Sequence, residues 1–194
     1  MKCLVIDAIA PQLVVCASDG ARIASRIGDT NAKLHNRLIL QYVDEVAREL
    51  QMPLAQLDAL GCVVGAGSFT GIRLGVATVN GLAFALEKPC VALTSMQELA
   101  YPVKTDRFVA AIDARHDNYY GAEFCGDWTR MTRQGCYTGE ELRAADCPVY
   151  YKSGPSDPQA LIDMTQILFA AGKTATLEPL YLKKSQAERE KDGE

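Results

Sequence analysis

Histidine is scarce in this 194-residue chain, in which His35 and His116 are the only two. A pair of zinc ligands on one helix needs the spacing H-x-x-x-H, so the sequence excludes that type of site and we expect no bound metal. No C-x-x-C motif occurs, the seven cysteines are odd in number, and four of them lie inside apolar, strand-like runs. This pattern favours reduced, buried thiols over a disulfide framework or a zinc site.

The chain also lacks an excess of positive charge, because its net charge is −4 and its pI is about 5.3. Proteins that bind nucleic acid directly normally present a basic face, so direct RNA or DNA binding is disfavoured. The N-terminal stretch MKCLVIDAIAP reaches Asp7 too early for a secretory segment, and Arg73 and five glycines interrupt residues 63–86 as a membrane span. We therefore expect a soluble, cytoplasmic protein without a membrane anchor.

Hydrophobic periodicity organises the first half of the chain into strands and helices. Short β-rich runs separated by turns predict strands over 3–6, 13–17 and 21–27, and continuous apolar runs predict buried strands over 59–64 and 90–93. Apolar residues at helical spacing predict helices over 34–50 and 70–86. Ser95, followed three residues later by Glu98, predicts a short helix that begins with a capping box.

The second half repeats this order of elements. Ile6-Asp7-Ala8 recurs as Ile112-Asp113-Ala114, and Gly20 recurs as Gly126 at the same offset of 106 residues, which indicates an internal duplication. A short helix over 138–145, a strand over 147–153 and a helix over 159–171 follow. We expect an N-terminal lobe over residues 1–103 and a shorter, degenerate lobe over 104–194, whose C-terminal helix can pack back on the first.

The glycine-rich loop at residues 65–71 matches no nucleotide or nucleophile motif. Its sequence G-A-G-S-F-T-G is one residue longer than the dinucleotide fingerprint, and Ile72-Arg73 stands where a phosphate loop has Lys-Ser or Lys-Thr. Ser68 lacks the flanking glycines of a nucleophile elbow, and both histidines are expected at the surface or at a helix cap.

Two acids, Asp7 and Asp113, each end a strand at a turn. Such residues either cap nearby backbone donors in an Asx turn or handle phosphate and magnesium in a two-lobed ATPase. Neither turn contains a glycine, and Pro11 removes a backbone donor from the first. We therefore expect these to be degenerate phosphate turns.

The helix over 70–86 carries more apolar surface than one sheet can cover, because apolar side chains surround it almost completely. Small residues at Gly71, Gly75, Thr78 and Ala85 would also let another helix approach closely. The helix over 34–50 shows the same excess, with a second apolar stripe at Leu34, Leu38 and Tyr42. Either both helices are covered within the monomer, or they form a docking surface for another protein.

The stretch GAGSFTGIRLGVATVNGLA (65–83) resembles the signature of the TsaB (YeaZ) family. VIDA (5–8), LTSMQELA (93–100), AAIDARHDNYYGAEF (110–124) and LEPLYLKK (177–184) resemble further segments of that family in the same order. The chain departs from the family pattern at Ala8-Ile9, at Asn36-Arg37 and at Ala66, which stands where the family has proline.

The resemblance implies an α/β fold of duplicated actin-like, Hsp70-like (RNase H-like) lobes, with central mixed β-sheets flanked by helices. It also implies a non-catalytic scaffold in tRNA threonylcarbamoyladenosine (t6A) biosynthesis that binds the transferase TsaD, together with TsaE. A homodimer is expected when the chain is alone, tRNA is expected to be reached only through the complex, and no cofactor is expected.

The residues expected to contact a partner lie on the two helices: Leu34, His35, Leu38, Tyr42, Gly71, Arg73, Leu74, Gly75, Thr78 and Leu82. The loop that shapes the start of the second helix comprises Gly65, Gly67, Ser68, Phe69 and Thr70. Arg73 has three open roles: it can cap carbonyl groups, pair with a carboxylate of the partner, or form an internal salt bridge.

Two enzymatic alternatives accompany the scaffold hypothesis. The first is a two-lobed ATP-dependent kinase or carbamoyltransferase that uses Asp7 and Asp113 to hold magnesium-ATP. The second is a peptidase acting on TsaD with Ser68 or a threonine as nucleophile, for which the sequence offers no placed base.

Overall fold

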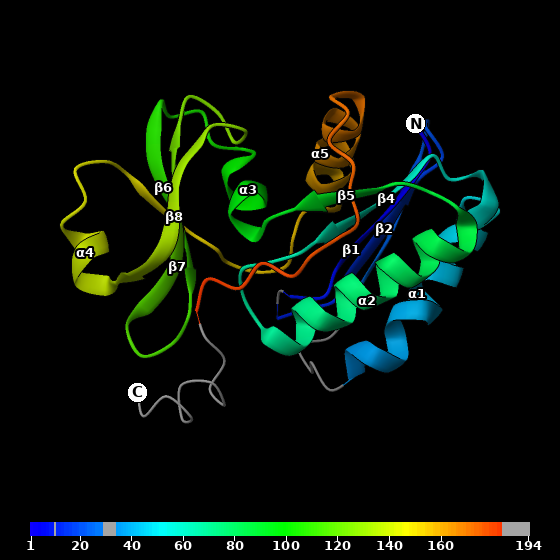
Figure 1. The fold of residues 1–194 in the computed structure, drawn as a ribbon, viewed down its shortest axis with the longest axis horizontal. Helices are drawn as coiled ribbons and strands as arrows, with labels where there is room; N and C mark the ends of the chain where they lie inside the picture. Colours follow the sequence, from blue (N-terminus) through cyan, green and yellow to red (C-terminus); the bar gives the residue numbers. More distant parts are fainter. Residues whose placement is uncertain (10, 29–33, 184–194) are drawn as a thin grey trace.

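The computed structural model describes residues 1–9, 11–28 and 34–183, which form two mixed β-sheets with helices on their faces (Figure 1). The first sheet has the order β3-β2-β1-β4-β5. Its strands are β1 (Cys3–Asp7), β2 (Val14–Ser18), β3 (Ile23–Ile27), β4 (Ala59–Val63) and β5 (Cys90–Leu93). β1 to β3 form an antiparallel meander, whereas β4 and β5 continue the sheet in parallel with β1. All five predicted strands of this half are confirmed.

Helices cover both faces of the first sheet. α1 (His35–Glu49) and α2 (Phe69–Leu86) lie on one face, and α5 (Pro158–Ala170) lies on the other (Figure 1). Neighbouring residues of a strand point to opposite faces, and β4 shows this clearly. A methyl group added at Gly61 would lie 2.6 Å from the hydroxyl of Thr165 in α5, while the next residue, Cys62, faces α2. Gly61 therefore allows α5 to pack unusually close to the sheet.

The second sheet repeats the connectivity of the first. Its order is β8-β7-β6-β9, and its strands are β6 (Arg107–Asp113), β7 (Asn118–Cys125), β8 (Met131–Thr138) and β9 (Val149–Tyr151). β6 to β8 form an antiparallel meander, and β9 is parallel to β6, as β4 is to β1. The predicted duplication is thus visible in the topology. β8 was not predicted, because most of its residues are exposed and it has no continuous apolar run.

Two short helices accompany the second sheet. α4 (Gly139–Arg143) begins at a capping box that Thr138 and Glu141 form, and α3 (Ser95–Ala100) packs on β6 and β7. The capping box predicted for Ser95 and Glu98 is wrong by one residue. Thr94 is the N-cap, and its Oγ1 accepts from the Gln97 N–H at 3.1 Å. Glu98 does not belong to the capping box; it is buried, and its carboxylate pairs with Lys152.

One apolar core is shared by both sheets. It includes Leu4 and Val63 of the first sheet, Met96 of α3, and the stacked rings of Phe108 and Phe124, whose centroids lie 5.3 Å apart in the second sheet. α5, from the second half of the chain, packs on β1, β2 and β5. The division at residues 103 and 104 remains a prediction about separate folding units.

The cysteines provide a direct test of this core. Cys3, Cys16, Cys62 and Cys90 are buried, whereas Cys125 and Cys136 are exposed. Burial raises the pKa of Cys3 to about 11 and raises the pKa of Cys16 and Cys62 well above the usual range. A thiol with a pKa near 11 is only about one part in a thousand thiolate at pH 8 and reacts slowly.

We therefore expect a disulfide-exchange reagent such as DTNB to modify Cys125 and Cys136 within minutes in native buffer at pH 8. All seven thiols should react after unfolding in guanidinium chloride. Peptide mapping by mass spectrometry identifies the modified positions, and rapid native modification of Cys16 or Cys62 would contradict the buried placement.

Candidate functional site

The glycine loop joins β4 to α2 and packs against the turn that follows β1. Ser68 is the N-cap of α2, and its Oγ accepts the Gly71 N–H at 3.3 Å. A methyl group at Gly71 would overlap the carbonyl oxygen of Ala8, and one at Gly67 would overlap the Ile9 side chain. Gly67 also has a φ of +150°, which L side chains rarely adopt. These glycines serve the close packing of two backbone segments.

Asp7 and Asp113 both form Asx turns, the first of the two roles that the sequence left open for these acids. Asp7 Oδ1 accepts the Ile9 N–H at 2.8 Å, and Asp113 Oδ1 accepts the Arg115 N–H at 2.7 Å. The second oxygen of Asp7 accepts the Ser156 hydroxyl at 2.6 Å, and Asp7 is buried. Both carboxylate oxygens of Asp7 are therefore already engaged in bonds within the protein.

The two histidines lie in different environments. His116 is exposed in the β6–β7 hairpin, as expected, where Arg115, His116 and Asp117 all have positive φ. His35 was expected at the surface or as a cap, and this is wrong: it is 3% exposed at the start of α1, and its Nε2 has no hydrogen-bond partner among the residues that the structure describes. A buried side chain at this position cannot contact a partner directly.

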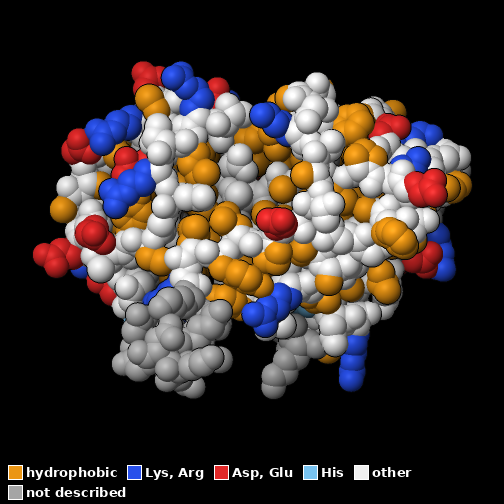
Figure 2. Space-filling view, viewed as in Figure 1, with side chains coloured by type: hydrophobic (Ala, Val, Ile, Leu, Met, Phe, Trp, Pro, Cys, Tyr) orange, Lys and Arg blue, Asp and Glu red, His pale blue; other side chains and the backbone are white. Residues whose placement is uncertain are grey.

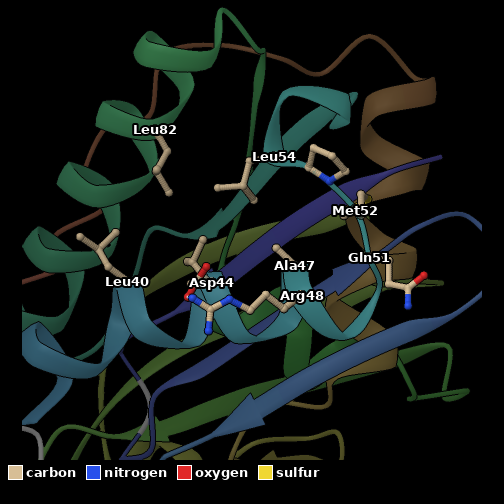
Figure 3. Close-up of a pocket in the computed structure, with 10 residues that line it drawn as sticks. Leu40, Asp44, Ala47, Arg48, Gln51, Met52, Leu54 and Leu82 are labelled. Carbon is tan, nitrogen blue, oxygen red and sulfur yellow. The ribbon is translucent and has the colours of Figure 1, made fainter.

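An apolar groove lies between the outer sides of α1 and α2 (Figure 3). Leu40 of α1 and Leu82 of α2 face it from its two sides, and Leu54 of the short helix η2 (Leu54–Gln56) closes one end. The hollow measures about 440 Å³. Asp44 and Arg48 form an ion pair of 2.5 Å beside it, on the same helix face as Leu40.

Each of the two helices also exposes one large apolar side chain. Leu40 is 57% exposed and Phe84 of α2 is 89% exposed, values that are high for side chains of this size. On the face shown in Figure 2, Lys and Arg side chains alternate with Asp and Glu, while hydrophobic side chains extend across the middle of the molecule. Large exposed apolar side chains of this kind are enriched at protein interaction sites.

The residues predicted to contact a partner divide into two groups. The outward or half-buried ones are Leu34, Leu38, Tyr42, Arg73, Leu74, Thr78 and Leu82. Gly71 and Gly75 are buried, since Gly71 faces Ala8 and Gly75 faces Cys62, so their assignment to a docking face is corrected. Leu40, which lines the groove, was not singled out from the sequence, because it lies outside both apolar stripes of α1.

A strap formed by residues 175–183 crosses α2 and the motif loop. Its Leu180 N–H donates to Val64 O at 2.8 Å, and Asn80 of α2 exchanges two hydrogen bonds with the backbone of Leu177, at 3.0 and 3.1 Å. Tyr181 stacks on Phe69 with ring centroids 4.9 Å apart. Tyr181 therefore lies directly beside the start of α2.

Arg73 contacts the same strap. Its Nε donates to the Tyr181 hydroxyl at 3.0 Å, and its guanidinium lies 5.8 Å from the centre of that ring. This contact is internal and joins Arg73 to a phenol. The motif residues Phe69 and Arg73 thus hold the strap against α2.

By length and composition alone, α2 would also pass as a membrane-crossing helix, a test that core helices of globular proteins satisfy too. Its side with Ile72, Val76 and Val79 is buried, and α2 packs on β1, β4 and β5.

Over residues 1–9, 11–28 and 34–183, no group of three or more His, Cys, Asp or Glu side chains has the arrangement of a metal site.

Two mixed sheets of matching connectivity, with helices on their faces, define a two-lobed protein of the actin-like class. Residues 28–142 match the family model described as TsaD, tRNA N6-adenosine threonylcarbamoyltransferase. The chain is 36% identical to a Haemophilus influenzae protein named tRNA threonylcarbamoyladenosine biosynthesis protein TsaB, over 50% of this chain and 42% of that protein. It is 32% identical to the Escherichia coli protein of the same name, over 57% of this chain and 47% of that protein.

The fold also matches a solved structure over nearly its full length. A Pseudomonas aeruginosa protein described as similar to peptidase YeaZ superimposes with a TM-score of 0.80 at 25% identity, over 94% of this chain and 99% of that one. The chain belongs to the TsaD family, in its TsaB (YeaZ) group. The matched region spans less than half the length of the two TsaB relatives.

Proposed function

We propose that this chain is a non-catalytic cytoplasmic subunit of the machinery that makes threonylcarbamoyladenosine in tRNA. In this proposal it docks a TsaD-type transferase through the groove between α1 and α2, and TsaE joins the assembly. The names of the TsaB relatives support the pathway, and the apolar groove with the exposed Leu40 at its edge carries the docking role.

The groove offers enough apolar surface to support association. Complete burial of Leu40 would contribute about 1.5–3 kcal/mol, before the entropic cost of association is subtracted. An amphipathic helix is the natural occupant of a groove between two helices, because its apolar stripe can fill the hollow along its length. A related chain with the same pair of helices, either TsaD or a second copy of this chain, offers such a stripe.

The chemistry of the loop supports a non-catalytic role. Asp7 uses both carboxylate oxygens internally, Gly67 and Gly71 serve backbone packing, and the Ser68 hydroxyl caps α2. These residues would have to abandon structural contacts before they could bind nucleotide or attack a peptide. Since the net charge is −4, tRNA is proposed to be bound through the partner and not by this chain alone.

The experiment replaces an exposed leucine of the groove by a charged residue. We expect Leu40→Asp to weaken binding to the TsaD subunit of the same organism by about 100-fold, because a carboxylate would be buried at an apolar contact. Isothermal titration calorimetry measures the affinity, and sedimentation of the chain alone shows whether the variant also shifts a homodimer toward monomer.

Ile167→Asp is the matched control. Ile167 is 45% exposed on α5, on the opposite face of the first sheet, so this variant should bind TsaD within twofold of the wild-type affinity. Equal affinities for Leu40→Asp and wild type would overturn the groove as the docking site. A wild-type chain that does not bind TsaD would overturn the proposed function.

A further inference from the structure

A chain of buried polar groups connects the second half of the molecule to the end of β1. Lys152, which follows β9, pairs with Glu98 of α3 and donates to Ser156 Oγ at 3.0 Å. The Ser156 hydroxyl then donates to Asp7 Oδ2 at 2.6 Å. Ser156 and Asp7 are each 2% exposed, so these bonds form in a region from which water is largely excluded.

The path continues from Asp7 to the start of α2. Asp7 Oδ1 holds the Ile9 N–H, which fixes the turn that follows β1. The carbonyl of Ala8 packs where Gly71 has no side chain, and the Ile9 side chain packs where Gly67 has none. Since no side chain separates the turn from the motif loop, a displaced turn would displace the first turn of α2.

We propose that Lys152, Ser156 and Asp7 are positioning residues that transmit the placement of the second sheet to the start of α2. Together they form a relay that fixes the orientation of the docking helix before a partner binds. This inference rests on the proposed function, because it concerns the geometry of the face that α1 and α2 present.

The direction of the hydrogen bonds in the relay supports this positioning role. Ammonium donates to hydroxyl and hydroxyl donates to carboxylate, so each group satisfies the next in one direction only. Charge-assisted bonds of this length constrain geometry more tightly than apolar packing, which tolerates sliding. A nucleophilic role for Ser156 does not fit, since its hydroxyl already donates to Asp7, Lys152 is paired with Glu98, and the site is closed to substrate.

Ser156→Ala tests the relay, because it removes the bridging hydroxyl and leaves the pair of Lys152 and Glu98 in place. We expect amide hydrogen exchange in residues 65–72 to accelerate by about tenfold and affinity for the TsaD subunit to fall by about tenfold. The matched control is Thr165→Val, which removes a buried hydroxyl whose bond to Leu161 O stays within α5. The control should leave both quantities within twofold of wild type.

If amide hydrogen exchange in residues 65–72 of Ser156→Ala is as slow as in the wild type, the relay is overturned. Faster exchange combined with wild-type affinity for TsaD would overturn it as well. A wild-type chain that fails to bind TsaD would overturn the proposed function, and the exchange rates would still decide whether the relay holds α2. If circular dichroism shows that Ser156→Ala is unfolded at 25 °C, Ser156→Cys replaces it, since cysteine keeps the volume and donates only weakly. The same two effects in the same direction are then expected.

Discussion

Replacing Lys152 with methionine should lower the free energy of unfolding by about 3–5 kcal/mol, because the change leaves the Glu98 carboxylate buried without its cation. The Lys152 and Glu98 side chains are only 12% and 7% exposed, so water cannot take over the role of the ammonium group. Methionine preserves most of the side-chain volume, so the loss reflects the charge of the ammonium group and its hydrogen bond to Ser156. Urea unfolding at pH 7, followed by circular dichroism, measures the loss.

The double variant Lys152→Met with Glu98→Gln separates charge from packing. Glutamine can still accept the Asp157 N–H that Glu98 Oε1 now accepts at 3.2 Å, and no unpaired charge is left in the interior. We expect the double variant to recover most of the lost stability, as pairs of buried ions often do when both are neutralised. A loss of less than 1 kcal/mol in the single variant would show that the pair is hydrated and contributes little.

Gly71→Ala should destabilise the fold by about 2–4 kcal/mol, because the new methyl group would overlap the carbonyl oxygen of Ala8. Neither segment can yield easily, since the Ala8 carbonyl belongs to the turn that Asp7 holds and Gly71 lies in the capped first turn of α2. Thermal and urea unfolding monitored by circular dichroism give the difference.

Gly75, one turn further along the same helix, provides the control. A methyl group there would lie 3.4 Å from Cys62 Sγ and 3.6 Å from Ala8 Cβ, close to ordinary contact distances. Since alanine favours helix by about 0.5–1 kcal/mol over glycine, Gly75→Ala should be neutral or slightly stabilising. Equal destabilisation of both variants would contradict the placement of the β1 turn against Gly71.

Periodicity predicted the elements that are buried on one or both sides. The strands β1, β2 and β4 are buried throughout, and α1 presents Ile39, Val43 and Val46 to the sheet at helical spacing, so their patterns are unambiguous. β8 escaped prediction because an exposed edge strand has no buried face to impose a pattern. The predicted capping box was one residue too late, because Thr94–Gln97 and Ser95–Glu98 both fit the motif. Only the tertiary burial of Glu98 selects between the two pairs.

The candidate site was harder to predict than the fold. The sequence indicates that α1 and α2 carry surplus apolar surface, but not which residues the sheet covers, so Gly71 and Gly75 were placed outward although both face the core. The groove between Leu40 and Leu82 emerges only when the two helices lie side by side. The relay from Lys152 to Asp7 links residues 145 positions apart in the chain, a contact that no local pattern can reveal.

The strap has a consequence for the order of events during biosynthesis. The surroundings of the docking helix include Leu177, Leu180 and Tyr181, and the far side of its sheet is covered by α5. A nascent chain that stops after Ala170 already carries α5 on the far face of the first sheet, but it leaves the start of α2 without its aromatic partner. In the proposed docking role, capture by another subunit would therefore be favoured only after Tyr181 has been translated, which would keep truncated polypeptides out of the assembly.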